Sequence, residues 1–137
     1  MTEKQYDGEA AAVLGVLDDV YKAWAANDAD AFVARYTEDA VAILPGSYRP
    51  TREAVRASMA GGFAGPLKGS STISKTLDVR LYGTDTAVVT SESGVMLIGE
   101  NEVPAPRMVL ATWVLTRRQG QWLIASYHNS SRDPAAH

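Results

Sequence analysis

The chain contains no cysteine and only two histidines, His128 and the C-terminal His137. Without cysteine there is no disulfide framework, no thiolate nucleophile and no zinc or iron–sulfur site built on sulfur. One histidine in the body of the chain, and no carboxylates clustered at ligand spacing, predict no metal site. The chain also has no phosphate-binding loop, and we expect no cofactor. The lack of cysteine fits a reducing cytoplasm, where we expect the protein to work.

An excess of positive charge and long apolar runs are missing as well. The net charge of −3 argues against nucleic acid, which binds clustered cations. The basic residues are scattered, which argues against an anionic membrane surface. No apolar run approaches the ~18 residues of a transmembrane span, and no signal peptide is visible. The 137 residues, 46% of them hydrophobic, predict one soluble domain over residues 1–137.

Apolar residues in the first half recur at the spacing of α-helices. One stripe predicts a helix from about residue 8 to 26. Asn27 or Asp28 is expected to cap a second, shorter helix that residues 37–39 break, followed by a short strand over Ala40–Leu44. Thr51 has the features of the N-cap of a third helix, which ends at a glycine-rich stretch.

The second half alternates with the two-residue period of β-strands. We expect strands over residues 73–81, 87–98, 108–117 and 122–128, with the last two joined in a hairpin around residues 118–121. Helices followed by meandering antiparallel strands are typical of an α+β fold, with the helices on one face of a curved sheet.

Three stretches of the chain resemble the nuclear transport factor 2-like (SnoaL-like) superfamily. Trp24-x-x-x-Asp28-Ala29-Asp30-Ala31-Phe32, with Tyr36-x-x-Asp39-Ala40-Val41, is similar to its opening. Gly120-x-Trp122-x-Ile124-Ala125-x-Tyr127-His128-Asn129-Ser130 is similar to its closing strand. The His-Asn-Ser ending resembles the SgcJ/EcaC branch, which is associated with enediyne polyketide and antibiotic biosynthesis. The resemblance implies a cystatin-like, cone-shaped barrel: a strongly curved antiparallel or mixed sheet wrapped around three N-terminal helices, with a pocket at the wide end.

One feature of the resemblance does not carry over. In ketosteroid isomerase-like members, a catalytic carboxylate lies late in the first strand, assisted by a tyrosine and a second acid. The corresponding positions here are Leu44, Val20, and Thr112 or Trp113. None of the three polar groups is present, which argues against steroid-type proton transfer by that machinery.

The predicted hairpin also predicts which side chains face the pocket, because side chains alternate across a strand. Arg117 opposite Trp122 places Trp113 opposite Ser126 and Ala111 opposite His128. We expect Trp113, Trp122, Ser126 and His128 to face inward, together with Ser91 and Ser93 of the preceding strand. The opposite face is apolar enough to predict a homodimer through the sheet, and its residues are Thr112, Val114, Leu123 and Tyr127.

Three residues are candidates for catalysis: His128, Asp39 and Tyr36. The unperturbed pKa of histidine, ~6.5, suits a general acid or base, although His128 also fits a ligand contact or a structural role. Asp39 fits a lone catalytic carboxylate or a residue that turns the chain. The resemblance also implies that Tyr48, Arg49 and Arg52 lie in a loop near the pocket mouth, where they would meet an anionic or carbonyl end of a ligand or form a solvated loop.

The candidate substrate-binding residues are aromatic rings and hydroxyls, with core packing as the alternative for Trp24 and Phe32. They are Trp24, Phe32, Ser91, Ser93, Trp113, Trp122 and Ser126.

The leading functional hypothesis is a small pocket protein of bacterial secondary metabolism. Its hydrophobic cavity would bind, and shape or protect, an apolar polyketide or polyene-like intermediate of the enediyne type. A cofactor-independent cyclase, isomerase or dehydratase, using His128 with Asp39 or Tyr36, is the first alternative. A non-catalytic dimerising module is the second.

Overall fold

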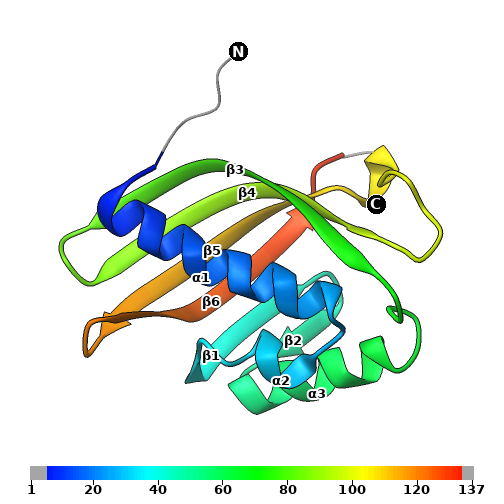
Figure 1. Ribbon diagram of the computed structural model, residues 1–137, viewed down its shortest axis with the longest axis horizontal. Coiled ribbons are helices and arrows are strands. Elements are labelled where there is room, and N and C mark those ends of the chain that lie inside the picture. Colours follow the sequence, from blue (N-terminus) through cyan, green and yellow to red (C-terminus); the bar gives the residue numbers. More distant parts are fainter. Residues whose placement is uncertain (1–5, 134–137) are drawn as a thin grey trace.

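Helices cover one face of a single sheet in the computed structural model, which describes residues 6–133 (Figure 1). Residues 1–5 and 134–137 of the predicted domain lie outside the described residues. The helices are α1 (Gly8–Ala25), α2 (Ala29–Phe32), α3 (Arg52–Phe63) and the short 3₁₀ helix η1 (Ala105–Arg107). The strands are β1 (Tyr36–Leu44), β2 (Ser47–Arg49), β3 (Ser71–Tyr82), β4 (Thr86–Met96), β5 (Val109–Arg118) and β6 (Gln121–Ser131). The predicted α+β class is confirmed.

Helix α1 lies across the sheet because its apolar residues form one stripe. The stripe is buried, and its members are Val13, Val16, Leu17, Val20 and Ala23. The helix ends where Asn27 adopts a positive φ of 52°. The Asn27 side chain donates to Trp24 O over 2.8 Å and accepts from Gly69 N over 2.6 Å, which ties this end of the helix to the start of β3. No helix among the described residues is both long and apolar enough to cross a membrane.

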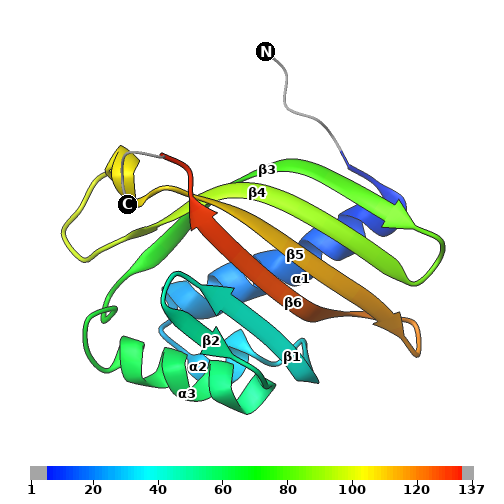
Figure 2. The same cartoon turned by 180° about the vertical axis from the view of Figure 1, so that it is seen from behind.

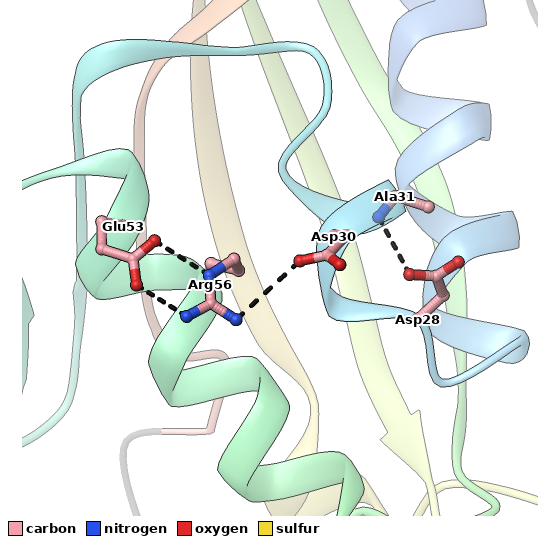
Figure 3. Close-up of polar contacts among 5 residues, drawn as sticks. All are labelled: Asp28, Asp30, Ala31, Glu53 and Arg56. Atoms are coloured by element: carbon pink, nitrogen blue, oxygen red, sulfur yellow. Dashed lines mark hydrogen bonds and ion pairs between the residues drawn. The ribbon is translucent and has the colours of Figure 1, made fainter.

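Helices α2 and α3 begin at side-chain caps. The Asp28 carboxylate accepts from Ala31 N over 3.0 Å, and the Thr51 hydroxyl accepts from Ala54 N over 3.1 Å, as the sequence predicted. Arg56 donates to Glu53 of the same helix, α3, over 2.6 Å, and it pairs with Asp30 of α2 at 3.8 Å (Figure 3). These carboxylates are exposed, so the ion pairs contribute little to stability.

The six strands form one mixed sheet in the order β2-β1-β6-β5-β4-β3. β1 runs parallel to β6, and the other neighbours are antiparallel. β2 and β3 are the edges of the sheet, so it wraps the helices without closing into the predicted barrel. Seen from behind, the outer face of β3–β6 is covered by none of the described helices (Figure 2).

A β-bulge in β6 decides which side chains face the helices. Leu115 pairs with Ile124 and Val114 pairs with Ser126, so Ala125 is an extra residue without a partner on β5. One extra residue reverses the inward and outward alternation of everything that follows it. The predicted register is therefore correct up to Ile124 and wrong beyond it.

The region around β1 differs from the prediction in two ways. β1 begins at Tyr36, not Ala40, because Tyr36 is buried and pairs with Ile124 of β6. Residues 37–39 consequently belong to the strand instead of breaking a helix. The short strand β2 was not predicted: the chain reverses at Gly46, whose φ is 74°, and three residues are too few to show a periodicity.

Candidate functional site

A cavity of about 290 Å³ lies between the helices and the inner face of the sheet. Its wall takes residues from α1, α2, α3 and all six strands, which shows that the whole fold is needed to build it. Most of the wall is apolar or aromatic; these side chains are Val20, Trp24, Phe32, Ala42, Leu44, Val55, Met59, Leu67, Val95, Val109 and Trp113.

An aromatic cluster forms the helical side of the cavity. The Trp24 ring meets Phe32 and Phe63 edge-on, with centroid distances of 5.8 and 5.7 Å. Trp24 Nε1 donates to the Ser70 hydroxyl over 2.8 Å. Because its only polar atom is used within the protein, Trp24 offers an incoming molecule apolar ring surface alone.

Two phenols from the sheet, Tyr36 and Tyr127, also reach the cavity wall. Burial raises the pKa of Tyr36, and the neighbouring Tyr127 adds to the shift. Burial likewise raises the pKa of Tyr127 to about 12. Asn129 Nδ2 donates to the Tyr127 hydroxyl over 2.8 Å, which leaves the phenolic proton of Tyr127 to donate onward. Both phenols therefore stay protonated at neutral pH and act as hydrogen-bond donors.

Several buried polar atoms on or beside this wall have no hydrogen-bond partner within the described part of the chain. On the wall they are Thr72 Oγ1, Trp113 Nε1 and Asn129 Oδ1. Ser91 and Trp113 lie close enough to the Tyr21 hydroxyl to lower its pKa, although burial raises that pKa overall. Neither makes a hydrogen bond of normal geometry. Unpaired buried polar groups are costly, so their gathering at one cavity makes it the candidate binding site.

Two arginines approach the cavity from β2 and η1, and their surroundings differ. Arg107 donates to Glu100 and to Val95 O, so its charge is compensated. Arg49 donates to the Ser47 hydroxyl over 3.1 Å and to the Met59 sulfur at 3.6 Å. Burial lowers the pKa of Arg49, an effect that Tyr36 and Tyr127 partly offset. No group of three or more metal-binding side chains occurs among the described residues.

The chain matches the SnoaL-like domain family over residues 13–134. It belongs to the SnoaL-like family. No curated protein matches it significantly. The resemblance to the SgcJ/EcaC branch, with its enediyne association, stays a prediction.

Solved structures with the same fold include three bacterial relatives. A cystatin-like domain of unknown function from Nostoc punctiforme has a TM-score of 0.84 at 22% identity, covering 93% of this chain and 80% of the other. A nuclear transport factor 2-like protein from Novosphingobium aromaticivorans has a TM-score of 0.79 at 20% identity, covering 92% and 84%. A ketosteroid isomerase-like protein from Erwinia carotovora has a TM-score of 0.73 at 19% identity, covering 94% and 100%. At these identities the likeness establishes the cystatin-like fold alone.

Half of the predicted site residues of this SnoaL-like domain lie on the cavity wall. They are Tyr36, Trp24, Phe32, Ser93 and Trp113. Val20 and Leu44, which the resemblance places at polar positions of ketosteroid isomerase-like members, also line the cavity.

The other half lie elsewhere. The bulge at Ala125 turns Ser126 and His128 to the outer face, where His128 is exposed, so their predicted inward orientation is wrong. Asp39 is exposed and accepts from the Thr37 hydroxyl over 2.8 Å. Trp122 is buried away from the cavity and donates to Glu9 over 2.6 Å. Ser91 is buried and faces inward as predicted, beside Tyr21 and not on the wall.

The sequence interpretation missed Tyr127 and Asn129, which the bulge turns inward. One signal for this was available: Trp122-Leu123-Ile124-Ala125 is a run of four apolar residues, which breaks the strict alternation of a regular strand. Tyr21, which also lines the cavity, lies within the helix predicted from about residue 8 to 26, and no local pattern distinguishes it from its neighbours.

Proposed function

We propose that this SnoaL-like domain binds a small, largely apolar molecule in its cavity, and that this molecule is a polyketide-type intermediate of bacterial secondary metabolism. The observation behind the proposal is a set of polar atoms on a mostly apolar wall that have no hydrogen-bond partner among the described residues: Thr72 Oγ1, Trp113 Nε1 and Asn129 Oδ1. Each such atom costs about 1–3 kcal/mol when it is buried without a partner. A ligand with a few polar groups on an apolar body removes that cost, and this is the usual chemistry of small-molecule pockets.

The size of the cavity narrows the ligand. Its volume of about 290 Å³ lies at the lower end of the roughly 300–1,000 Å³ typical of ligand pockets. A compact one- or two-ring body fits such a space, whereas an extended polyene would project from the mouth. A cyclised or partial polyketide therefore suits the cavity better than a full linear chain. The enediyne setting rests on the family resemblance.

Acid–base catalysis, the first alternative, has less support from the geometry. Among the described residues of the wall, the ionisable side chains are tyrosines and arginines, which are protonated near neutral pH. They are able to polarise a ligand carbonyl but not to accept a proton from it. His128 and Asp39, the predicted acid–base residues, lie outside the wall. Binding, with donation of hydrogen bonds to the ligand, is therefore the function that the cavity supports best.

We also propose that the domain forms a homodimer through the outer face of the sheet. This face exposes apolar side chains of three strands, Ile43, Leu77 and Leu110, each about 40% exposed. Antiparallel sheets often bury such a face against a second copy.

The proposed binding is tested by native mass spectrometry of the protein purified from its own host. We expect a small molecule bound at a stoichiometry of one per chain and released by organic solvent. Ala42→Trp fills the cavity from β1 and should abolish the bound mass. Val41→Trp adds the same ring to the other face of β1 and serves as the matched control. A bound mass that both variants retain places the ligand elsewhere and contradicts the proposal.

A further inference from the structure

Arg49 occupies an unusual position for a charged residue. It is half-buried on a mostly apolar cavity wall; burial lowers its pKa, and the titratable groups that oppose this shift are the phenols Tyr36 and Tyr127. One of its guanidinium nitrogens donates to a thioether sulfur, Met59 Sδ, which is a weak acceptor. The Arg49 guanidinium therefore keeps N–H donors for which the described residues provide no strong acceptor.

The other arginines differ from Arg49 in having a carboxylate partner or an exposed position. Seven of them pair with a carboxylate within the described chain: Arg35, Arg52, Arg56, Arg80, Arg107, Arg117 and Arg132. Arg118 lies exposed beside the β5–β6 turn, where water solvates it. Arg49 is thus the half-buried arginine for which the described residues supply no carboxylate, and it lies on the cavity wall.

We infer that the cavity ligand carries a carboxylate, which Arg49 binds through its guanidinium fork. The inference rests on the proposed binding function and adds the chemical class of the ligand: a small aromatic or alicyclic monocarboxylic acid. Guanidinium and carboxylate match in shape as well as in charge, because two parallel N–H donors meet two oxygens.

A single negative charge fits the cavity better than two. Arg107, the other cation on the wall, is already compensated by Glu100. A dianion beside Arg49 would leave one charge without a counterion in apolar surroundings, where desolvation is costly. The Tyr36 and Tyr127 hydroxyls near Arg49 supply neutral donors for a carboxylate oxygen, and Trp24 and Phe32 supply ring surface for the ligand's body.

The test uses pairs of probes that differ only in charge. Benzoate, cyclohexanecarboxylate and 2-naphthoate are each compared with their neutral amide by titration calorimetry at pH 7. We expect the best-fitting carboxylate to bind about 10- to 100-fold more tightly than its amide, as for a charge-assisted bidentate contact. Phenyl phosphate at pH 8 tests the dianion and should bind more weakly than benzoate.

Variants of Arg49 test whether this residue causes the preference for a carboxylate over its amide. Arg49→Gln should remove the preference for the carboxylate while leaving amide affinity within about threefold. Arg49→Lys should retain part of it, because a point charge lacks the fork. Arg118→Gln, which removes the exposed arginine, is the matched control and should bind like the wild type. Circular dichroism and thermal unfolding establish that each variant is folded.

The outcomes separate this inference from the proposed function. If an amide and its acid bind equally and Arg49→Gln changes neither, the carboxylate is wrong and the binding cavity stands. If phenyl phosphate binds more tightly than benzoate, the monoanion is wrong. If no probe binds and Ala42→Trp retains the native ligand, both the inference and the proposed function fail.

Discussion

The side-chain amide of Asn129 donates to the hydroxyl of Tyr127 over 2.8 Å, and both side chains belong to the cavity wall. The two residues are two positions apart on β6, and alternate residues of a strand point to the same face of the sheet. That this face is the inner one follows from the unpaired Ala125 two residues before Tyr127. A single-residue irregularity thus replaces a histidine at the pocket by a phenol and an amide.

The raised pKa of Tyr127 predicts a loss of stability in alkali. Between pH 10 and 12 the native state keeps a proton that the unfolded chain has released, because burial raises this pKa from 10.0 to about 12. The contribution of Tyr127 is complete below pH 10 and is lost as the pH rises through 12. Relative to Tyr127→Phe, the wild type should lose about 1–3 kcal/mol of unfolding free energy over this range, measured by urea denaturation. Tyr82→Phe, which removes a phenol that is 55% exposed, is the control. If the unfolding free energy falls equally with pH in the wild type and in Tyr127→Phe, the burial of the Tyr127 phenol is contradicted.

The outward position of His128 predicts that it is dispensable for ligand binding. His128→Ala should leave carboxylate affinity, measured by calorimetry, within about twofold of wild type, because the side chain lies on the outer face. Tyr127→Phe, one residue earlier and on the inner face, should weaken binding about fivefold or more by removing a donor. A tenfold loss in His128→Ala alone would show that the strand parity is reversed.

The apolar outer face predicts a homodimer at micromolar concentration. Leu110→Glu places a charge on this face and should shift the mass measured by light scattering from dimer to monomer. Ile98→Glu, at an exposed position in the β4–β5 loop, is the control. Tyr127, which the sequence placed on the outer face, is unsuitable for this test because it faces the cavity. A monomeric wild type would contradict the proposed assembly.

Leu44 at the cavity wall predicts no isomerisation of a 3-keto-Δ5 steroid by the wild type, followed by the absorbance of the conjugated product. Leu44→Asp puts a carboxylate on the wall that also holds Arg49, whose guanidinium donates to Ser47 opposite Leu44. The loss of stability at pH 7 should therefore be smaller than the several kcal/mol of an isolated buried carboxylate. Thermal unfolding at pH 7 and pH 4, compared with Leu44→Asn, isolates the effect of the charge. Steroid turnover by the wild type would show that the carboxylate position was misassigned.

The sequence by itself determined the elements whose pattern is local. The helical stripe of α1 and the Thr51 cap follow from residues within a few turns of one another, and both were predicted. The Arg117–Trp122 pair in the β5–β6 hairpin and the inward parity of β4 were also predicted, because a short turn and strict alternation fix them.

Only the tertiary structure decided the composition of the cavity. With the bulge at Ala125, β6 pairs with β5 on one side and with β1 on the other, and β1 comes from a distant part of the chain. Arg49 reaches the cavity wall beside Tyr36 and Tyr127 only because β2, β1 and β6 are neighbours in the folded sheet. Such features minimise the energy of contacts between segments distant in the sequence, so no local period records them, and one extra residue is enough to exchange His128 for Tyr127 at the wall.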